Sequence, residues 1–198
     1  MDIFIQIIGF VGCGLIALSS IQKSKGRMLL FMAFGGLIFC IHYLLLGAWA
    51  GALMNGVSIL RAFAFRSFGG KRKNDRILIA IFVPAILLCY PLAFLFGTEP
   101  TLYHFLVELL PIAAMVLATF SFALPDAAKI RRISIIVSPM WLLYNIFHVS
   151  IGGIICESIN LAALIYGIFV IDRRAKKQAA EAAASTESAP EKAPERSE

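Results

Sequence analysis

The feature of this sequence that most restricts its fold is a series of long apolar runs joined by short polar connections. Most runs are long enough to cross a hydrocarbon layer of roughly 30 Å as a helix that rises about 1.5 Å per residue. Hydrophobic residues make up 60% of the chain, which leaves little for a soluble domain. The pattern predicts an all-α polytopic membrane protein with seven transmembrane helices, at residues 3–21, 28–47, 50–65, 76–97, 101–124, 133–150 and 151–171.

The basic residues predict how the chain is oriented in the membrane. They follow the first, third, fifth and seventh apolar runs, and the other connections contain no Lys or Arg. Such a one-sided distribution predicts a cytoplasmic location for all four clusters, with the N-terminus outside and the C-terminus in the cytoplasm. The net charge of +6 is explained in this way, so no nucleic-acid partner is expected.

The first three and the last three apolar runs resemble two copies of one pattern. An ungapped shift of 102 residues places Gly51 on Gly153 and Asn55 on Glu157, and hydropathy and loop charge agree along all three runs. Two units that begin on the same side of a membrane need one extra crossing between them. We therefore predict a transmembrane domain over 1–172 with 3+1+3 parallel repeats: repeat one 3–65, a linker helix 76–97, and repeat two 101–171.

The end of the chain, residues 173–198, has a different composition, rich in Ala, Glu, Ser and Pro. It contains too few apolar residues to form a core. We predict a disordered cytoplasmic tail, whose first part could alternatively extend the last helix.

Polar side chains within the apolar runs are the candidate site residues. In lipid a polar group without a partner costs several kcal/mol, so each one needs a partner or a function. Positions taken from the helical rise place these groups in the middle and the outer half of the membrane, with one set in each repeat. The predicted substrate-binding residues are Asn55, Glu157, His42, Asn145, Asn160, Glu108 and His148.

Glu157 is the strongest of these candidates. It lies about six residues, or roughly 9 Å, from the outer end of its run, where an ionised carboxylate must be paired or hydrated. We expect it to carry a proton, with His42 or His148 as relays to the outer surface. For the asparagines, hydrogen bonds between helices, of about 0.6 kcal/mol each, are an equally good explanation. Arg61 lies four residues from the expected cytoplasmic end of its run, so we expect its side chain to reach the membrane surface.

Two prolines within apolar runs, Pro111 and Pro139, predict kinks, because proline removes a backbone hydrogen bond. Gly9 and the pair Gly35-Gly36 stand at corresponding parts of repeat one. These positions suit a gating motion, and close packing of small residues is the alternative.

Two stretches of the chain carry a resemblance to a known family. The first contains Ile41-His42-Tyr43, Leu45-Leu46-Gly47, Asn55 and Arg61, and the second contains Trp141, Asn145, Ser150-Ile151-Gly152-Gly153 and Glu157. In order and spacing they resemble the YgjV family of bacterial inner-membrane proteins, over about residues 5–172. The resemblance implies a location in the bacterial inner membrane and no particular chemistry.

The 3+1+3 plan more distantly resembles the SWEET and PQ-loop transporters. In SWEETs an asparagine from the third helix of each repeat faces the sugar, and Asn55 matches that role. The ungapped counterpart in repeat two is Glu157, with Asn160 one turn away, so the resemblance does not extend to a neutral sugar substrate. The Pro-Gln pair of PQ-loop proteins is replaced here by Ile21-Gln22.

The function that these observations favour is transport of a small polar solute through a site between the repeats, with a proton as coupling ion. The alternative is a non-transporting membrane scaffold or assembly protein. No metal-ligand spacing, nucleophile motif or Gly-rich phosphate loop indicates an enzyme, and the four isolated cysteines indicate neither a metal site nor disulfides, so no cofactor is expected. The expected partners are the lipid bilayer, the solute and, as an alternative to a monomer, a second copy of the chain.

Overall fold

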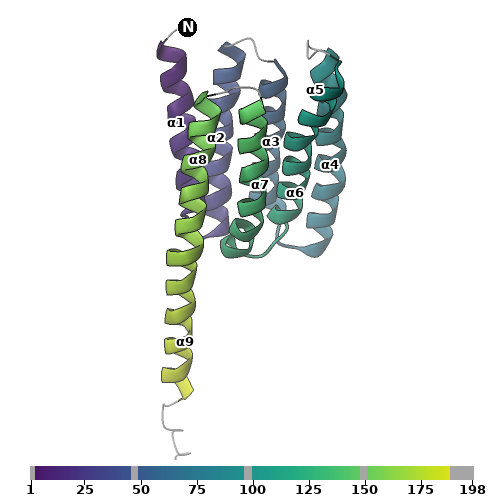
Figure 1. The fold of residues 1–198 in the computed structure, drawn as a ribbon. Coiled ribbons are helices and arrows are strands. Elements are labelled where there is room, and N and C mark those ends of the chain that lie inside the picture. The colour runs from purple at the N-terminus through teal and green to yellow at the C-terminus, as the bar shows by residue number, and fades with distance from the viewer. Residues whose placement is uncertain (1–2, 46–48, 96–99, 148–150, 188–198) are drawn as a thin grey trace, which may run out of the picture.

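The computed structural model describes residues 3–45, 49–95, 100–147 and 151–187, and the regular structure in these residues is entirely helical. α5 and α6 follow one path, and α8, η1 and α9 form one continuous helix, so the helices match the seven predicted runs (Figure 1). The predicted all-α fold is confirmed. The elements are α1 (Ile3–Ser20), α2 (Lys25–Leu45), α3 (Trp49–Phe68), α4 (Arg72–Leu95), α5 (Leu102–Val107), α6 (Leu109–Phe122), α7 (Ala127–Phe147), α8 (Ile151–Tyr166), the π-helical η1 (Gly167–Asp172) and α9 (Arg173–Glu187).

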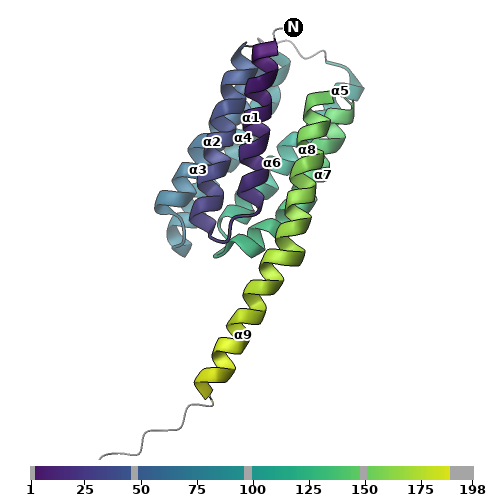
Figure 2. The same cartoon turned by 90° about the vertical axis from the view of Figure 1, so that its left-hand side faces the viewer.

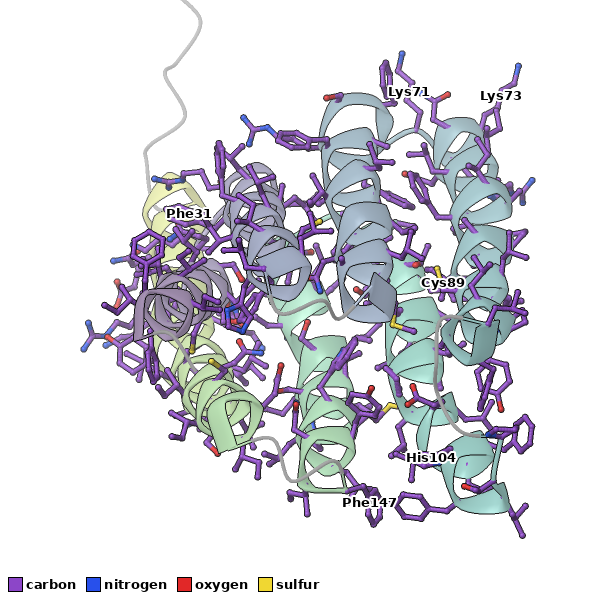
Figure 3. The ribbon with its side chains drawn as sticks, turned by 90° about the horizontal axis from the view of Figure 1, so that it is seen from above. Phe31, Lys71, Lys73, Cys89, His104 and Phe147 are labelled. Atoms are coloured by element: carbon purple, nitrogen blue, oxygen red, sulfur yellow. The ribbon has the colours of Figure 1, made fainter. Side chains whose placement is uncertain are left out.

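The helices stand in two rows that face each other, as the view from above shows (Figure 3). α1, α2, α3 and α4 pack in chain order in the first row, and α6, α7 and α8 form the second. Contacts of α1 with α8 and of α4 with α6 join the two rows at their ends, and smaller contacts of α2 with α7 and α3 with α6 join them in between. α4 thus lies between α3 and α6, and so separates the group α1, α2 and α3 from the group α6, α7 and α8 at that end of the rows. The relation between these groups as parallel repeats stays a prediction.

The surface of the bundle fits a lipid environment. Large apolar side chains such as Phe10, Leu60, Leu88 and Phe120 are exposed on its outside. Among the described residues, four helices are long and apolar enough to cross a membrane, within Lys25–His42, Arg72–Leu95, Leu102–Phe122 and Gly152–Glu181. α3 and α7 are not in this group, and they are the helices that carry several of the polar side chains described below.

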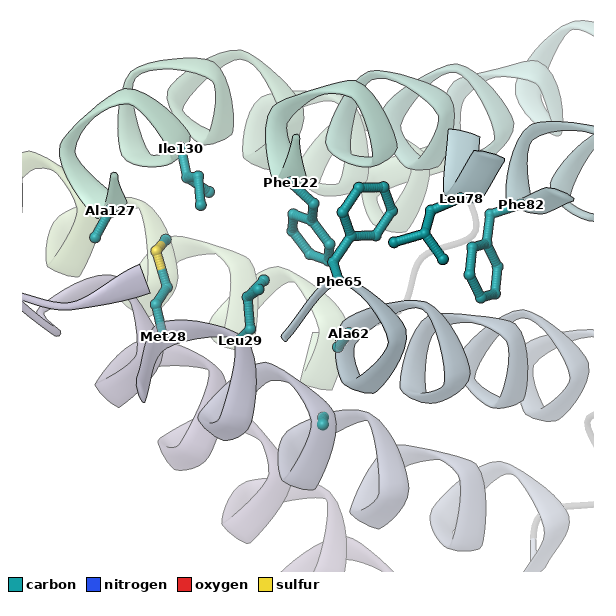
Figure 4. Packing of buried hydrophobic residues seen from close by; sticks show 10 residues of the cluster. Met28, Leu29, Ala62, Phe65, Leu78, Phe82, Phe122, Ala127 and Ile130 are labelled. Carbon is teal, nitrogen blue, oxygen red and sulfur yellow. The ribbon is translucent and has the colours of Figure 1, made fainter. Parts of the chain in front are cut away.

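One end of the bundle, which we call the basic end, contains the turns α1–α2, α3–α4 and α6–α7 and the point where α9 leaves the bundle (Figures 1 and 2). All four basic clusters lie there, as the sequence predicted. A compact apolar cluster from α2, α3, α4, α6 and α7 packs at the same end (Figure 4), and includes Leu29, Phe65, Phe82, Phe122 and Ile130. This cluster packs α2, α3 and α4 of the first row against α6 and α7 of the second. Which side of the membrane the basic end faces stays a prediction.

Proline and glycine shape the helices locally. α5 ends at Val107 and α6 begins at Leu109, because Pro111 has no N–H and its ring displaces the carbonyl of Val107. The helix is thus interrupted close to Pro111, where we predicted a kink, while α7 stays helical through Pro139. A Cβ atom at Gly35 would lie 2.7 Å from the Ile16 side chain, so this glycine permits the close approach of α1 and α2.

The first part of the predicted tail extends the last helix. The helix continues through η1 and α9 to Glu187, which agrees with the alternative given for residues after 173 and not with disorder from that point. Alanine has the highest helix propensity, and a Lys177–Glu181 ion pair of 3.6 Å spans one helical turn. Residues 188–198 lie outside the described residues.

Candidate functional site

A cavity of about 200 Å³ lies between the two rows of helices. Six helices line it, α1, α2, α3, α6, α7 and α8, and α4 supplies none of the lining residues. The volume is sufficient for several water molecules or for a small solute. The polar side chains of its wall are Ser20, Asn55, Ser58, Arg61, Ser134, Ser138, Asn145, Glu157 and Asn160.

On the wall formed by α7 and α8, Glu157 is held by hydrogen bonds. Ser138 Oγ donates to Glu157 Oε2 at 2.7 Å, and Asn160 Nδ2 lies 3.4 Å from the same oxygen. Ser20 Oγ on α1 donates to Asn160 Oδ1 at 2.8 Å, which extends the network to the first row. The other carboxyl oxygen, Glu157 Oε1, makes no hydrogen bond with the described residues. One oxygen is thus fixed by the protein, and the other is available to a proton or a solute.

On the wall formed by α3 and α6, the charged group is Arg61. Its side chain is only 4% exposed, so our expectation that it reaches the membrane surface was wrong. Nη1 donates to the Met115 carbonyl at 2.7 Å and to Thr119 Oγ1 at 2.8 Å, and Nη2 donates to Ser58 Oγ at 3.1 Å. The guanidinium also stacks over the Phe122 ring, 4.7 Å from its centroid. α3 continues to Phe68, so Arg61 lies about two turns inside the helix and cannot reach its end.

A second buried arginine, Arg131 on α7, has a different environment. It is 1% exposed and forms an ion pair with Asp172 in η1. It also donates to the backbone carbonyls of Ser20 and Gln22 at the end of α1. Arg131 therefore has a carboxylate partner, whereas Arg61 has no such partner among the described residues.

Four of the predicted site residues line the cavity: Asn55, Asn145, Glu157 and Asn160. They come from α3, α7 and α8, so both rows contribute. Asn145 also donates through Nδ2 to the Trp141 carbonyl of its own helix at 2.9 Å. Their assignment to a solute stays a prediction.

The other three predicted residues lie elsewhere. His42 packs against Gly9, and its Nδ1 lies 2.8 Å from the Ile5 carbonyl oxygen, so it joins α2 to α1 outside the cavity lining. Glu108 is buried between α5 and α6, with its Oε1 3.5 Å from the hydroxyl of Tyr144. His148 lies outside the described residues.

The residues that our predictions omitted are mainly hydroxyl groups and Arg61. Their spacing gives a signal that could have identified them, because side chains three or four residues apart share a helix face. On α3 the cavity residues are Asn55, Ser58 and Arg61, each three residues from the next. On α7 the corresponding stripe is Ser134, Ser138, Trp141 and Asn145.

Comparison with known protein families identifies the chain. A model of the Imp-YgjV family, described as a bacterial inner membrane protein, matches residues 3–175. The chain belongs to this family. The YgjV resemblance is thereby confirmed, and the location of this Imp-YgjV protein is the bacterial inner membrane, which it crosses several times. The match includes every residue that lines the cavity and ends within α9. No curated protein and no solved structure matches the chain, so the likeness to SWEET and PQ-loop transporters stays a prediction.

Proposed function

We propose that this protein transports a small polar solute across the bacterial inner membrane, with the solute bound in the cavity between the two rows of helices. The observation that carries the proposal is the position of that cavity, which has polar walls and is lined by three helices of each row. Polar side chains are rare inside membrane proteins and commonly mark solute or ion pathways. A site between two groups of helices that move against each other is a recurring plan in transporters.

The side chains that line the cavity have different roles in this proposal. Asn55, Asn145 and Asn160 exchange hydrogen bonds within the protein for hydrogen bonds to the solute, because each amide has both donors and acceptors. Ser138 holds Glu157 through Oε2, and Oε1 takes up a proton or accepts a hydrogen bond from the solute. The apolar cluster at the basic end separates the cavity from that side, and its opening would release the solute there. We propose binding and transport without catalysis, since the described lining contains one carboxyl group and no histidine.

Glu157 supplies the proton coupling in this proposal. The ionisable groups that line the same cavity are Cys13 on α1, Cys156 on α8 and Arg61 on α3. Among the described residues, α7 contributes only uncharged side chains to this wall. Replacement of Glu157 by Gln keeps the shape and the acceptor for Ser138 but removes the ability to ionise.

A solute screen with purified protein tests the proposal. Sugars, amines, amino acids and small carboxylic acids are added to the detergent-solubilised protein, and a bound solute raises the melting temperature by mass action. Uptake of the stabilising solute into proteoliposomes is then measured over a range of pH. We expect Glu157→Gln to insert normally and to lose the pH dependence of uptake. The matched control is Glu181→Gln on the exposed α9, which should behave as wild type.

The alternative function, a non-transporting scaffold, is favoured by one observation. The hydrogen bonds among Ser20, Ser138, Glu157 and Asn160 also join α1, α7 and α8, as expected for groups that only hold helices together. Under this alternative no solute stabilises the protein or enters proteoliposomes. Glu157→Gln then lowers only the melting temperature. Full pH dependence of uptake in the Gln variant would contradict the role of Glu157 as proton carrier.

A further inference from the structure

The structure supports a more specific statement about the solute, which rests on the proposed transport function. We propose that the solute carries a carboxylate group and that the guanidinium of Arg61 binds it. The class of solute is then a small monocarboxylic acid with a short apolar body.

The first argument is the charge of Arg61. A guanidinium stays protonated in proteins, and a buried charge without a counter-charge costs several kcal/mol. Arg61 is 4% exposed, lines the cavity, and forms no ion pair with a described residue. Arg131, the other buried arginine of the described residues, has its carboxylate in Asp172. A carboxylate on the solute would be the counter-charge of Arg61, as Asp172 is the counter-charge of Arg131.

The second argument is the geometry of the guanidinium. Nη1 is fully used by the Met115 carbonyl and Thr119 Oγ1. The opposite edge, formed by Nε and Nη2, makes one hydrogen bond with described residues, to Ser58 Oγ at 3.1 Å. The Nε–H is buried and has no hydrogen-bond partner among the described residues, which is rare for a donor inside a protein. This edge is one that binds a carboxylate through two parallel hydrogen bonds, after the Ser58 hydroxyl turns away.

The third argument is the surroundings of this edge. Met115 and Phe122 lie beside Arg61, and Met32 adds apolar surface to the same cavity. Asn55 lies three residues before Ser58 on the same face of α3. A neutral sugar would leave the guanidinium without a counter-charge. A protonated amine would be repelled by it. A dianion such as phosphate would place a second negative charge in a cavity that already contains the carboxyl group of Glu157. A single carboxylate on an apolar body fits all of these groups.

The experiment measures binding through tryptophan fluorescence. The chain has two tryptophans, so the variant Trp49→Phe leaves Trp141, which lines the cavity, as the only one. In this background the probes are butyrate, lactate and benzoate, the amide of each acid, butylamine, glucose and inorganic phosphate. We expect the carboxylates to bind and their amides to bind at least about tenfold more weakly, because the amides cannot form hydrogen bonds between two charged groups.

The variants test the role of Arg61 directly. Arg61→Lys keeps the positive charge but loses the pair of parallel N–H donors. It should weaken carboxylate binding by about tenfold or more. Arg61→Gln, which removes the charge, should abolish the preference for acid over amide. The matched control is Arg66→Gln, an exposed arginine on the same helix, which should bind carboxylates as wild type. If Arg61→Gln fails to insert, Arg61→Lys alone decides the question.

Each outcome has a separate meaning. Equal binding of acid and amide, or unchanged carboxylate binding in Arg61→Lys, overturns the inference and assigns Arg61 to helix packing. Binding of glucose, butylamine or phosphate in place of the carboxylates also overturns it, while the proposed transport function stands. If no probe and no member of the wider solute screen binds, the proposed function itself fails.

Discussion

The ion pair between Arg131 and Asp172 gives a prediction whose size follows from the structure. The two side chains are 1% and 13% exposed, and both carboxylate oxygens of Asp172 accept hydrogen bonds from the guanidinium. Replacement of Asp172 by Ala leaves Nε and Nη2 of Arg131, a side chain that is 1% exposed, without these acceptors. Removal of one partner of a buried pair costs about 3–5 kcal/mol. We expect Asp172→Ala to lower the free energy of unfolding by about that amount.

The basic end also contains an exposed pair that serves as a control. Lys129 and Asp126 are separated by 3.5 Å, with side chains 52% and 49% exposed. Asp126 caps α7 by accepting from the Lys129 backbone N–H at 2.8 Å, so the control has to change the lysine and keep the cap. Because exposed pairs contribute about 0–1 kcal/mol, Lys129→Ala should have a small effect.

The assay is reversible unfolding in mixed detergent micelles, monitored by far-ultraviolet circular dichroism. A double variant, Arg131→Met with Asp172→Leu, completes the test, because replacement of both charges by apolar side chains should restore most of the lost stability. Equal losses for Asp172→Ala and Lys129→Ala would refute the argument from burial. A double variant as unstable as Asp172→Ala would show that the loss comes from packing and not from an unpaired charge.

Two further predictions concern packing and topology. A Cβ atom at Gly153 would lie 2.0 Å from Asn145 Oδ1, whereas one at Gly152 would meet nothing within 4 Å. Gly153→Ala should therefore lower stability by about 1–3 kcal/mol in the same unfolding assay and Gly152→Ala should not, and equal effects would contradict the contact. From the charge distribution we expect a reporter fused after residue 198 to be active in the cytoplasm and one fused near residue 99 to be active outside, and two reporters active on the same side would disprove the predicted topology.

The bounds of the helices were predictable because they depend on the order of apolar and charged residues along the chain. Apolar length and the position of charged clusters determine where a membrane helix begins and ends, within a few residues. The largest differences before the tail are at two helix starts: α7 begins at Ala127 where we expected residue 133, and α4 begins at Arg72 where we expected residue 76. At its other end α3, which we expected to stop at residue 65, continues to Phe68. That error mattered, because it placed Arg61 near the membrane surface.

The grouping of Asn55, Asn145, Glu157 and Asn160 around one cavity was anticipated from depth alone. Depth follows from the helical rise, but the direction in which a side chain points depends on how neighbouring helices pack. His42 has a polar side chain in the same predicted set, yet it faces α1 and the Ile5 carbonyl oxygen. Contacts between helices cannot be derived from one helix alone, so the hydrogen-bond partners of Ser20 and Ser138 became known only from the structure.

The end of α1 links the cavity to the basic end, and this restricts how the rows can move. Ser20 takes part in both networks: its hydroxyl donates to Asn160, and its carbonyl accepts from Arg131. Asn160 bonds to Glu157 in the cavity, and Arg131 bonds to Asp172 in η1. A movement that opens the basic end between the rows must therefore break these bonds or carry the end of α1 along with α7 and α8. Since the bonds to Arg131 are charge-assisted and buried, the second course costs less, and the end of α1 would move together with α7 and α8.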